Sequence, residues 1–279
     1  MTREERVETI RSGRWIRYSR AEQILARLEA LFTTPRSHRM PNLLLVGETN
    51  NGKTMIVNRF VKRHPPMANV DGDASCVPVF SMQAPPVPDE GRFYNAILSG
   101  IFVPFKLSAR VDQKQFQVLR VLPQVGVRML IIDEIHHVLA GTMLKQRHFL
   151  NVIKHLGNEL QIPIVGVGTR DAFNAIHSDP QLANRFEPAI LPRWQDDDEL
   201  LRLLSSFEQA LPLLHSSGLT KRSIALKILS LSEGTIGEIS TLLTRAALYA
   251  IDNGTERITP TALERCGYVA PSQRKRMAV

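Results

Sequence analysis

The chain has 279 residues, of which 43% are hydrophobic and 22% charged, values that are ordinary for a folded protein with one or two domains. No run approaches the about 18 apolar residues of a membrane span, and the charged N-terminus lacks the apolar core of a signal peptide. We therefore expect no membrane partner and a cytoplasmic location. The net charge of +8 favours phosphate-rich partners, although charge alone is weak evidence for nucleic acid.

The first half of the chain predicts a helix, a strand and a second helix in that order. Apolar residues recur on one helical face from Ser19 until Pro35. The run 42–46, NLLLV, is typical of a buried parallel strand. The segment 47–54, GETNNGKT, follows directly, and the apolar residues of 56–61 predict the next helix. This segment therefore lies at a strand–loop–helix junction.

The remaining pattern predicts an α/β core followed by a smaller helical part. Strands are expected at 77–82, 129–132, 162–167 and 189–191, with helices at about 92–102, 112–122 and 143–159. Strands that alternate with helices predict a parallel sheet. From about residue 196 the pattern is purely helical. We expect four parts: an N-terminal basic arm and helix at 1–40, the nucleotide-binding core at 41–195, a helical lid at 196–268 and a basic tail at 269–279.

Residues 47–54, here called the phosphate loop, match the Walker A pattern GxxxxGK[ST] in full. Gly47 and Gly52 allow backbone angles that side chains disfavour, and the asparagines between them tolerate left-handed geometry. The loop N–H groups can then converge on phosphate oxygens. Lys53 is expected to reach the β- and γ-phosphates of ATP, and the Thr54 hydroxyl to bind Mg²⁺. The predicted nucleotide-binding residues are Gly47, Glu48, Thr49, Asn50, Asn51, Gly52, Lys53, Thr54 and Asp133.

The run 129–134, MLIIDE, supplies the acidic residues that an ATPase site needs in addition to the phosphate loop. Four apolar residues predict a buried strand, and Asp133 emerges at its end, where it can hold Mg²⁺ together with Thr54. Glu134 is then placed to polarise an attacking water. His136 and His137 follow, but no third metal ligand is apparent beside them. A DExH helicase box fits poorly, because its loop reads GxGKT and the chain leaves no room for a second motor domain.

Two further residues are predicted to take part in catalysis. Thr169 ends the strand at 162–167 and can bond the γ-phosphate or the attacking water, the role called sensor 1. Its alternative role is to cap the next helix. Arg185 precedes the last strand, where an arginine can stabilise the transition state on a neighbouring subunit's ATP. Its alternative is an intramolecular salt bridge.

These motifs in this order resemble the AAA+ ATPases, and more narrowly the TniB/TnsC/MuB group, with the TniB branch most similar. The resemblance spans roughly residues 15–265. The segments that carry it are MPNLLLVGETNNGKTMIVNRF (40–60), MLIIDEIHHVLAG (129–141), VGTRDAFNAI (167–176), LANRF (182–186) and EGTIGEISTLLTRAA (233–247). The fold implied is a P-loop NTPase (AAA+) parallel-sheet core with a small C-terminal helical lid.

The resemblance also implies a function in DNA transposition. Such ATPases form rings or helical filaments on duplex DNA when ATP is bound, recruit a DDE-type transposase, in some systems with a TniQ-type adaptor, and disassemble on hydrolysis. In the relatives, DNA is held by loops between the second and third core strands, which here is 83–127. The DNA-binding candidates in that segment are Arg92, Lys106, Arg110 and Lys114. We expect binding with little sequence preference, because phosphate contacts carry little sequence information.

One departure from the family pattern concerns the lid. Many relatives carry a sensor 2 arginine after a GxxG-type stretch, whereas Gly237 is followed here by Glu238, a carboxylate that would repel a γ-phosphate. Either Glu238 points away or the role passes to another residue such as Arg245. Two alternative functions therefore stay open: a helicase loader of the IstB/DnaC kind, and a scaffold locked by nucleotide with negligible turnover.

Overall fold

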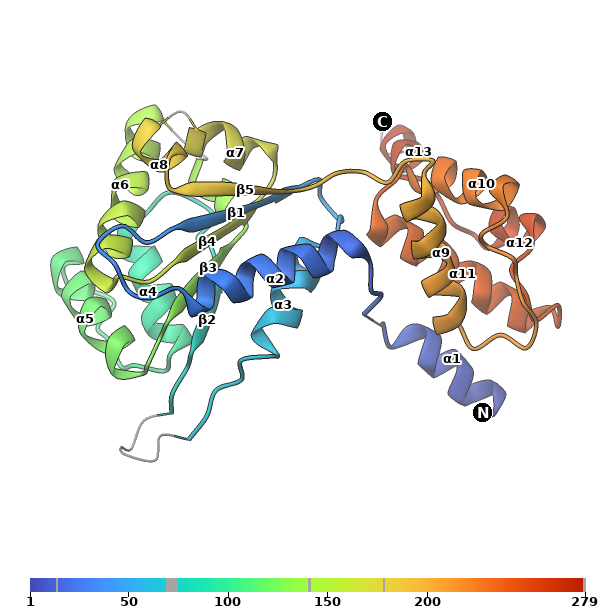
Figure 1. Ribbon diagram of the computed structural model, residues 1–279, viewed down its shortest axis with the longest axis horizontal. Helices are drawn as coiled ribbons and strands as arrows, with labels where there is room; N and C mark the ends of the chain where they lie inside the picture. Colours follow the sequence, from blue (N-terminus) through green and yellow to red (C-terminus); the bar gives the residue numbers. More distant parts are fainter. Residues whose placement is uncertain (14, 69–74, 140–141, 178, 278–279) are drawn as a thin grey trace. The chain divides into compact units, whose positions relative to one another are not determined.

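The computed structural model describes residues 1–279 except 14, 69–74, 140–141, 178 and 278–279, so the expected segments 129–141 and 269–279 end outside the described residues. The chain divides into two compact units (Figure 1). The α/β unit consists of Ile24–Gly47 and Lys53–Leu191, and the helical unit of Met1–Gln23, Glu48–Gly52 and Pro192–Val279. None of the described helices is long and apolar enough to cross a membrane.

A five-stranded sheet in the order β2-β3-β4-β1-β5 forms the centre of the α/β unit. The strands are β1 (Asn42–Gly47), β2 (Val79–Gln83), β3 (Met129–Asp133), β4 (Ile164–Gly168) and β5 (Phe186–Leu191). All pairings between neighbouring strands are parallel, which confirms the expected sheet. All six residues of β1 are buried, as a strand covered on both faces requires.

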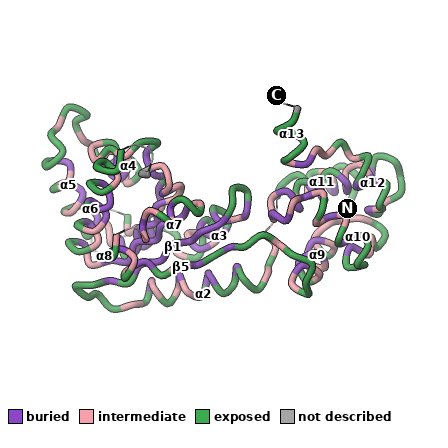
Figure 2. The backbone as a smooth tube through the Cα atoms, turned by 90° about the horizontal axis from the view of Figure 1, so that it is seen from above, coloured by how far each residue is buried: buried purple, intermediate pink, exposed green. Residues whose placement is uncertain are grey.

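Helices lie on both sides of this sheet. They are α2 (Ser19–Thr33), α3 (Lys53–Val61), α4 (Glu90–Gly100), α5 (Val111–Gln124), the 3₁₀ turn η1 (Ile135–Leu139), α6 (Met143–Leu160), α7 (Arg170–His177) and α8 (Pro180–Ala183). α2 runs along one side of the strands, while α4, α5 and α6 gather on the other (Figures 1 and 2). Leu44 and Val46 pack in one hydrophobic cluster with residues of α4, α5 and α6. Because side chains alternate along a strand, Leu43 and Leu45 face the opposite side.

Strand β5 begins three residues earlier than the sequence predicted. It runs from Phe186 and pairs with β1 along its whole length, including Pro188 opposite Leu44. Proline has no N–H to donate, and the predicted strand began only after Pro188. β5 is an edge strand with one neighbour, so the missing donor leaves no gap in the ladder.

The helical unit has its own hydrophobic core. Its helices are α1 (Arg3–Arg11), α9 (Asp198–Ala210), α10 (Arg222–Ser232), α11 (Ile236–Asp252), α12 (Pro260–Arg265) and α13 (Pro271–Met277). Three leucines of α9 and two of α11 are fully buried, and Ile10 of α1 joins the same cluster. The segment expected as a basic arm therefore contains a helix that packs on the C-terminal helices. The basic tail likewise contains a helix, α13.

A buried ion pair ties α1 to the helical unit. Arg6 donates from both guanidinium nitrogens to the Glu256 carboxylate, at 2.6 and 2.9 Å, and its side chain is only 10% exposed. The hydrogen bonds from Arg6 lower the pKa of Glu256 below its usual value. This contribution to stability is therefore complete above the ordinary glutamate pKa and is lost as the pH falls through the lowered pKa.

Replacing Arg6 by methionine is expected to lower the melting temperature by several degrees at neutral pH, because Glu256 then stays buried without its cation. The difference between variant and wild type should shrink as the pH falls below the ordinary glutamate pKa and through the lowered pKa of Glu256. Thermal unfolding measured across pH checks both points. Arg3→Met is the matched control, since the Arg3–Asp252 pair is exposed. Equal melting temperatures for all three proteins would contradict the assigned role of Arg6.

Candidate functional site

The carboxyl ends of the three central strands bring the predicted catalytic residues to one edge of the sheet. Register places Val46 of β1 beside Gly168 of β4, and Ile132 of β3 beside Gly166. Lys53, Asp133 and Thr169 each follow within a few residues of these ends. β4 lies between β3 and β1, as the prediction for Thr169 required. Parallel α/β sheets bind ligands at this edge.

The Thr54 hydroxyl donates a hydrogen bond of 2.7 Å to Oδ2 of Asp133. These residues stand 79 positions apart, so the bond joins the first turn of α3 to the end of β3. Lys53 is buried, and its ammonium donates to the Gly47 carbonyl at 3.0 Å. A hydroxyl, a carboxylate and an ammonium therefore lie around the start of α3, whose N-terminal end carries partial positive charge.

The Thr54–Asp133 pair fits Mg²⁺. Both groups offer oxygen atoms, which are the ligands that this hard cation prefers, and few protein ligands suffice because Mg²⁺ keeps several waters. Bound there, the ion would neutralise negative charge on phosphate oxygens. Thr54 is exposed and Asp133 half-buried, so both oxygens can be reached by a ligand.

Glu134 adopts a left-handed backbone conformation, with φ of 53°, directly after β3. Its N–H donates to Oδ1 of Asp133 at 2.8 Å, and its Oε2 lies 3.1 Å from Nε2 of His136. The sequence showed no third metal ligand beside the two histidines, yet the Glu134, His136 and His137 ligand atoms lie within 4.8 Å of one another. A metal held by these three residues would engage Glu134, the predicted base.

Thr169 offers a hydroxyl that none of the described residues bonds. Its Oγ1 is buried and has no hydrogen-bond partner among the described residues, while its carbonyl accepts from Ala172 N–H in the first turn of α7. The alternative role as a side-chain cap of α7 is therefore not realised in this structure. A buried hydroxyl without a partner is costly unless a ligand or water completes it.

The phosphate loop was expected to contain residues with left-handed backbone angles. Two positions have such angles and a third does not. Asn50 and Gly52 have φ of 61° and 82°, the left-handed geometry predicted for this loop. The expected special backbone angle is not found at Gly47. Gly47 does not have positive φ, because it is the last residue of β1 and pairs with Leu191. The left-handed positions of the loop therefore lie after Gly47.

Loop residues Glu48–Gly52 group with the helical unit. Asn51 donates from Nδ2 to the Pro192 carbonyl at 3.0 Å, and Glu48 lies 3.9 Å from the Arg193 guanidinium. Asn50 donates from Nδ2 to Oε1 of Glu238 at 3.0 Å. Glu238, the residue at the position expected for sensor 2, therefore contacts the loop through Asn50. The sequence had singled out Glu238 as a departure but gave no signal for its partner.

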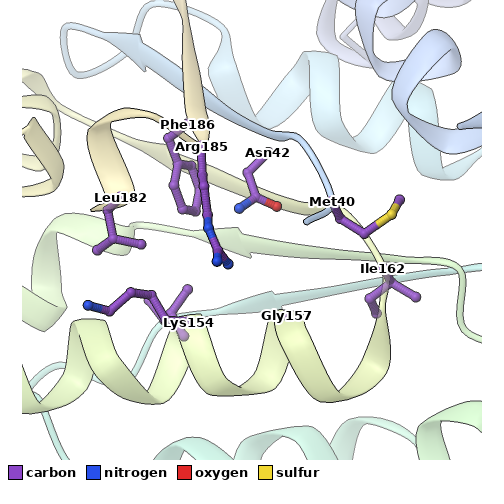
Figure 3. A pocket seen from close by; sticks show the side chains of 9 residues that line it. Met40, Asn42, Lys154, Gly157, Ile162, Leu182, Arg185 and Phe186 are labelled. Carbon is purple, nitrogen blue, oxygen red and sulfur yellow. The ribbon is translucent and has the colours of Figure 1, made fainter. Parts of the chain in front are cut away.

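Arg185 lies at the opposite edge of the sheet from the phosphate loop. Its carbonyl accepts from Asn42 N–H at the start of β1, whereas the loop follows the other end of β1, roughly 17 Å away at 3.3 Å per residue. Its guanidinium points toward α6 and donates to Oδ1 of Asn158 at 2.7 Å (Figure 3). No described carboxylate pairs with it, so the predicted alternative of a salt bridge is not observed.

A sequence profile described as "Bacterial TniB protein" matches residues 6–196 of the chain. The chain belongs to the TniB family. This match covers α1 from residue 6 onward, the whole α/β unit and both Walker motifs. No curated protein matches this TniB-family chain.

Solved structures share the fold of this TniB-family chain at low identity. The ORC2 protein of Aeropyrum pernix has a TM-score of 0.64 at 14% identity, covering 98% of this chain and 74% of that one. Cdc6p from Pyrobaculum aerophilum has a TM-score of 0.65 at 17% identity, covering 93% and 69%. The RuvB Holliday junction branch migration motor of Thermotoga maritima has a TM-score of 0.54 at 17% identity, covering 90% and 68%. The fold is therefore that of P-loop AAA+ proteins with a helical C-terminal part.

The DNA-binding candidates of this TniB-family chain fall into two groups. Arg92, Lys106 and Arg110 are exposed, and Arg110 also lies 3.1 Å from Asp112. Lys114 differs, because it is buried and its ammonium donates to the Leu107 carbonyl at 2.9 Å. In this structure Lys114 holds the loop between α4 and α5, while the side chains of the other three lie on the surface.

Proposed function

We propose that this chain is a Mg²⁺-dependent ATPase. The observation that carries the proposal is the bond between the Thr54 hydroxyl and the Asp133 carboxylate, which joins the two Walker motifs at the end of the sheet. Loop N–H groups and Lys53 bind the phosphates, Thr54 and Asp133 hold Mg²⁺, and Thr169 orients the γ-phosphate or the attacking water. Glu134 takes the proton of that water.

We further propose that the ATPase acts as a regulator of DNA transposition. Membership of the TniB family supports a DDE-type transposase as the partner, with a TniQ-type adaptor in some systems. The exposed residues Arg92, Lys106 and Arg110 support contact with duplex DNA without strong sequence preference. The AAA+ fold, which is shared with the ORC1 protein of Aeropyrum pernix solved in complex with DNA, supports assembly around DNA as a homo-oligomer.

Binding to labelled random-sequence duplex DNA, in ATP and in ADP at one fixed salt concentration, tests this function. Tight cooperative binding in ATP alone is expected. Single-stranded DNA of the same length is the second arm of the experiment. A preference for single strands would favour a helicase loader, and no binding to either would contradict a DNA-dependent role.

The second candidate function is a scaffold that binds ATP and turns it over negligibly. The contact that favours it is the pairing of Glu134 with His136 at 3.1 Å, because a base engaged by histidine is withdrawn from the attacking water. In that case ATP would assemble the oligomer and hydrolysis would not limit its lifetime. Steady-state turnover in the presence of saturating duplex DNA separates the two functions.

Arg185 is proposed to complete the site of a neighbouring subunit. Arg185→Ala should therefore leave ATP binding by the monomer unchanged and lower hydrolysis by the oligomer about 10³-fold or more, as expected for an arginine finger. Mixing Arg185→Ala with Glu134→Gln gives a sharper test, because Glu134→Gln is expected to bind ATP and assemble while it keeps Arg185. Interfaces that combine an intact Glu134 from the first variant with an intact arginine from the second should recover activity that neither variant has alone.

Recovery on mixing requires that the arginine act between subunits. Asn158→Ala is the matched control, because it removes the hydrogen-bond partner of Arg185 but keeps the guanidinium. If the mixture stays as inactive as its components while both variants still form oligomers, the assignment of Arg185 in trans is wrong. Unfolding of Arg185→Ala in thermal melts would instead assign it a structural role.

A further inference from the structure

The phosphate loop supplies the N-terminal cap of α11. Gly237 N–H donates to the Asn50 carbonyl at 3.0 Å, and Ile236 N–H to Oδ1 of Asn51 at 3.4 Å. Thr235, the residue in the N-cap position, makes no side-chain cap bond, and its buried hydroxyl has no partner among the described residues. Loop oxygens thus satisfy N–H groups that a helix leaves unpaired at its start.

Asn50 packs so closely on Gly237 that any side chain at 237 would have to displace the Asn50 amide. A Cβ added to Gly237 would lie 1.9 Å from Oδ1 of Asn50. Asn50 itself holds a left-handed backbone conformation that few residues other than glycine adopt readily. The conformation of the loop at this point therefore depends on what holds the Asn50 side chain.

Glu238 holds that side chain and connects it to the C-terminal segment. Its Oε1 accepts from Nδ2 of Asn50, and its Oε2 accepts from the Tyr268 hydroxyl at 2.7 Å and from the Arg274 guanidinium. Glu238 is 7% exposed, so these three donors satisfy its carboxylate in place of bulk water. Burial, together with Glu238, raises the pKa of Tyr268, which keeps its hydroxyl protonated and donating.

Arg274 is the cation that offsets the charge of Glu238. Without it, a carboxylate bonded to the phosphate loop would repel a bound phosphate chain. Arg274 comes from α13 and also donates to the Val269 carbonyl at 2.9 Å. Arg245, considered earlier as a replacement for sensor 2, lines the same pocket of ≈ 380 Å³ but donates to the Gly267 carbonyl.

We propose that Arg274 is a positioning residue for the phosphate loop and that it acts through Glu238 on Asn50. The C-terminal helix thereby sets the affinity of the loop for nucleotide. The inference rests on the proposed binding of ATP by this loop and deepens it by naming the element that regulates it. Arg274 acts on the loop's conformation and charge, so it should change nucleotide affinity and leave the chemical step alone.

A double-mutant cycle of Arg274 and Glu238 tests whether Arg274 changes nucleotide affinity through Glu238. Arg274→Ala should weaken binding of a fluorescent ATP analogue by about 5- to 10-fold, while kcat at saturating ATP stays within about twofold. Glu238→Gln keeps an acceptor for Asn50 but removes the charge. In that background Arg274→Ala should change affinity by less than about twofold. Arg276→Ala, exposed on the same helix, is the matched control.

Hydrogen exchange of the nucleotide-free protein tests the positioning independently of ATP. In Arg274→Ala, peptides that cover 48–54 and 234–240 should exchange faster, because the bond from Gly237 N–H to the Asn50 carbonyl opens more often. The exchange rate of a peptide that covers β4 should be unchanged. A melting temperature of Arg274→Ala close to that of the wild type would exclude global destabilisation.

The outcomes separate the two proposals. Wild-type affinity in Arg274→Ala, or an equal loss in the Glu238→Gln background, would overturn the inference. If the wild-type protein binds no nucleotide, the proposed ATPase function fails. The exchange experiment then still decides whether Arg274 positions the loop, since unchanged exchange at 48–54 and 234–240 overturns it and faster exchange supports it.

Discussion

Replacing Glu134 by glutamine is expected to lower kcat for ATP hydrolysis by about 10²- to 10⁴-fold while ATP still binds. Glutamine has the size of glutamate but cannot take the proton of the attacking water. The Mg²⁺ ligands proposed here, Thr54 and Asp133, are untouched, so nucleotide affinity should stay near wild type. Single-turnover hydrolysis, measured beside equilibrium binding of a fluorescent ATP analogue, separates the two quantities. The slow variant should also remain on duplex DNA as an oligomer.

Glu159→Gln is the control for this substitution, because Glu159 is exposed near the end of α6. It removes the same negative charge as Glu134→Gln. It should hydrolyse ATP at the wild-type rate. Wild-type kcat in Glu134→Gln would remove Glu134 as the base. If the wild-type protein and Glu134→Gln are equally slow in the presence of DNA, the scaffold function is favoured instead.

Lys53→Ala is expected to weaken ATP binding by about 100-fold or more and to abolish ATP-dependent assembly. Lys53 is buried, and its ammonium lies beside the Gly47 carbonyl at the start of the loop. Hydrogen bonds from a charged donor contribute about 1.5–3 kcal/mol each, and each 1.4 kcal/mol corresponds to a tenfold change in Kd. Loss of two such bonds to phosphate oxygens accounts for the expected effect.

Lys62→Ala removes the same charge from an exposed position just after α3 and should bind ATP normally. Thermal melts of both variants exclude unfolding as the cause of lost binding. ATP-dependent assembly that survives in Lys53→Ala would contradict the assignment of 47–54 as the phosphate loop.

The sheet was predictable because its central strands are continuous apolar runs. Residues 42–46 and 129–132 are buried on both faces and were predicted as strands, with bounds that differ by one residue from those observed. The positions of Lys53 and Asp133 were predictable for a related reason, since Asp133 ends such a strand and Lys53 begins the helix after the loop that follows another. Local sequence was sufficient there, because a strand, its turn and the residue that ends it are neighbours in the chain.

Contacts between distant residues could not be predicted in this way. α1 contains few apolar residues, and its place in the helical unit depends on Arg6 and Glu256, which are 250 positions apart. Glu238 bonds to Asn50 across 188 positions and to Arg274 across 36. A charged side chain in a basic tail is usually solvated, and only tertiary structure gives Arg274 a buried partner. Helix propensity and hydrophobic periodicity predict neither the Arg6–Glu256 ion pair nor the bonds of Glu238.

The fit between Asn50 and Gly237 links two motifs that are far apart in the sequence. A Cβ at 237 and the amide of Asn50 cannot occupy the same space. Substitutions at the two positions are therefore expected to be inherited as a pair during divergence of the family: a larger residue at 237 becomes acceptable once position 50 is small. An arginine introduced at 237 should consequently be tolerated in the Asn50→Gly background and rejected in the wild-type one.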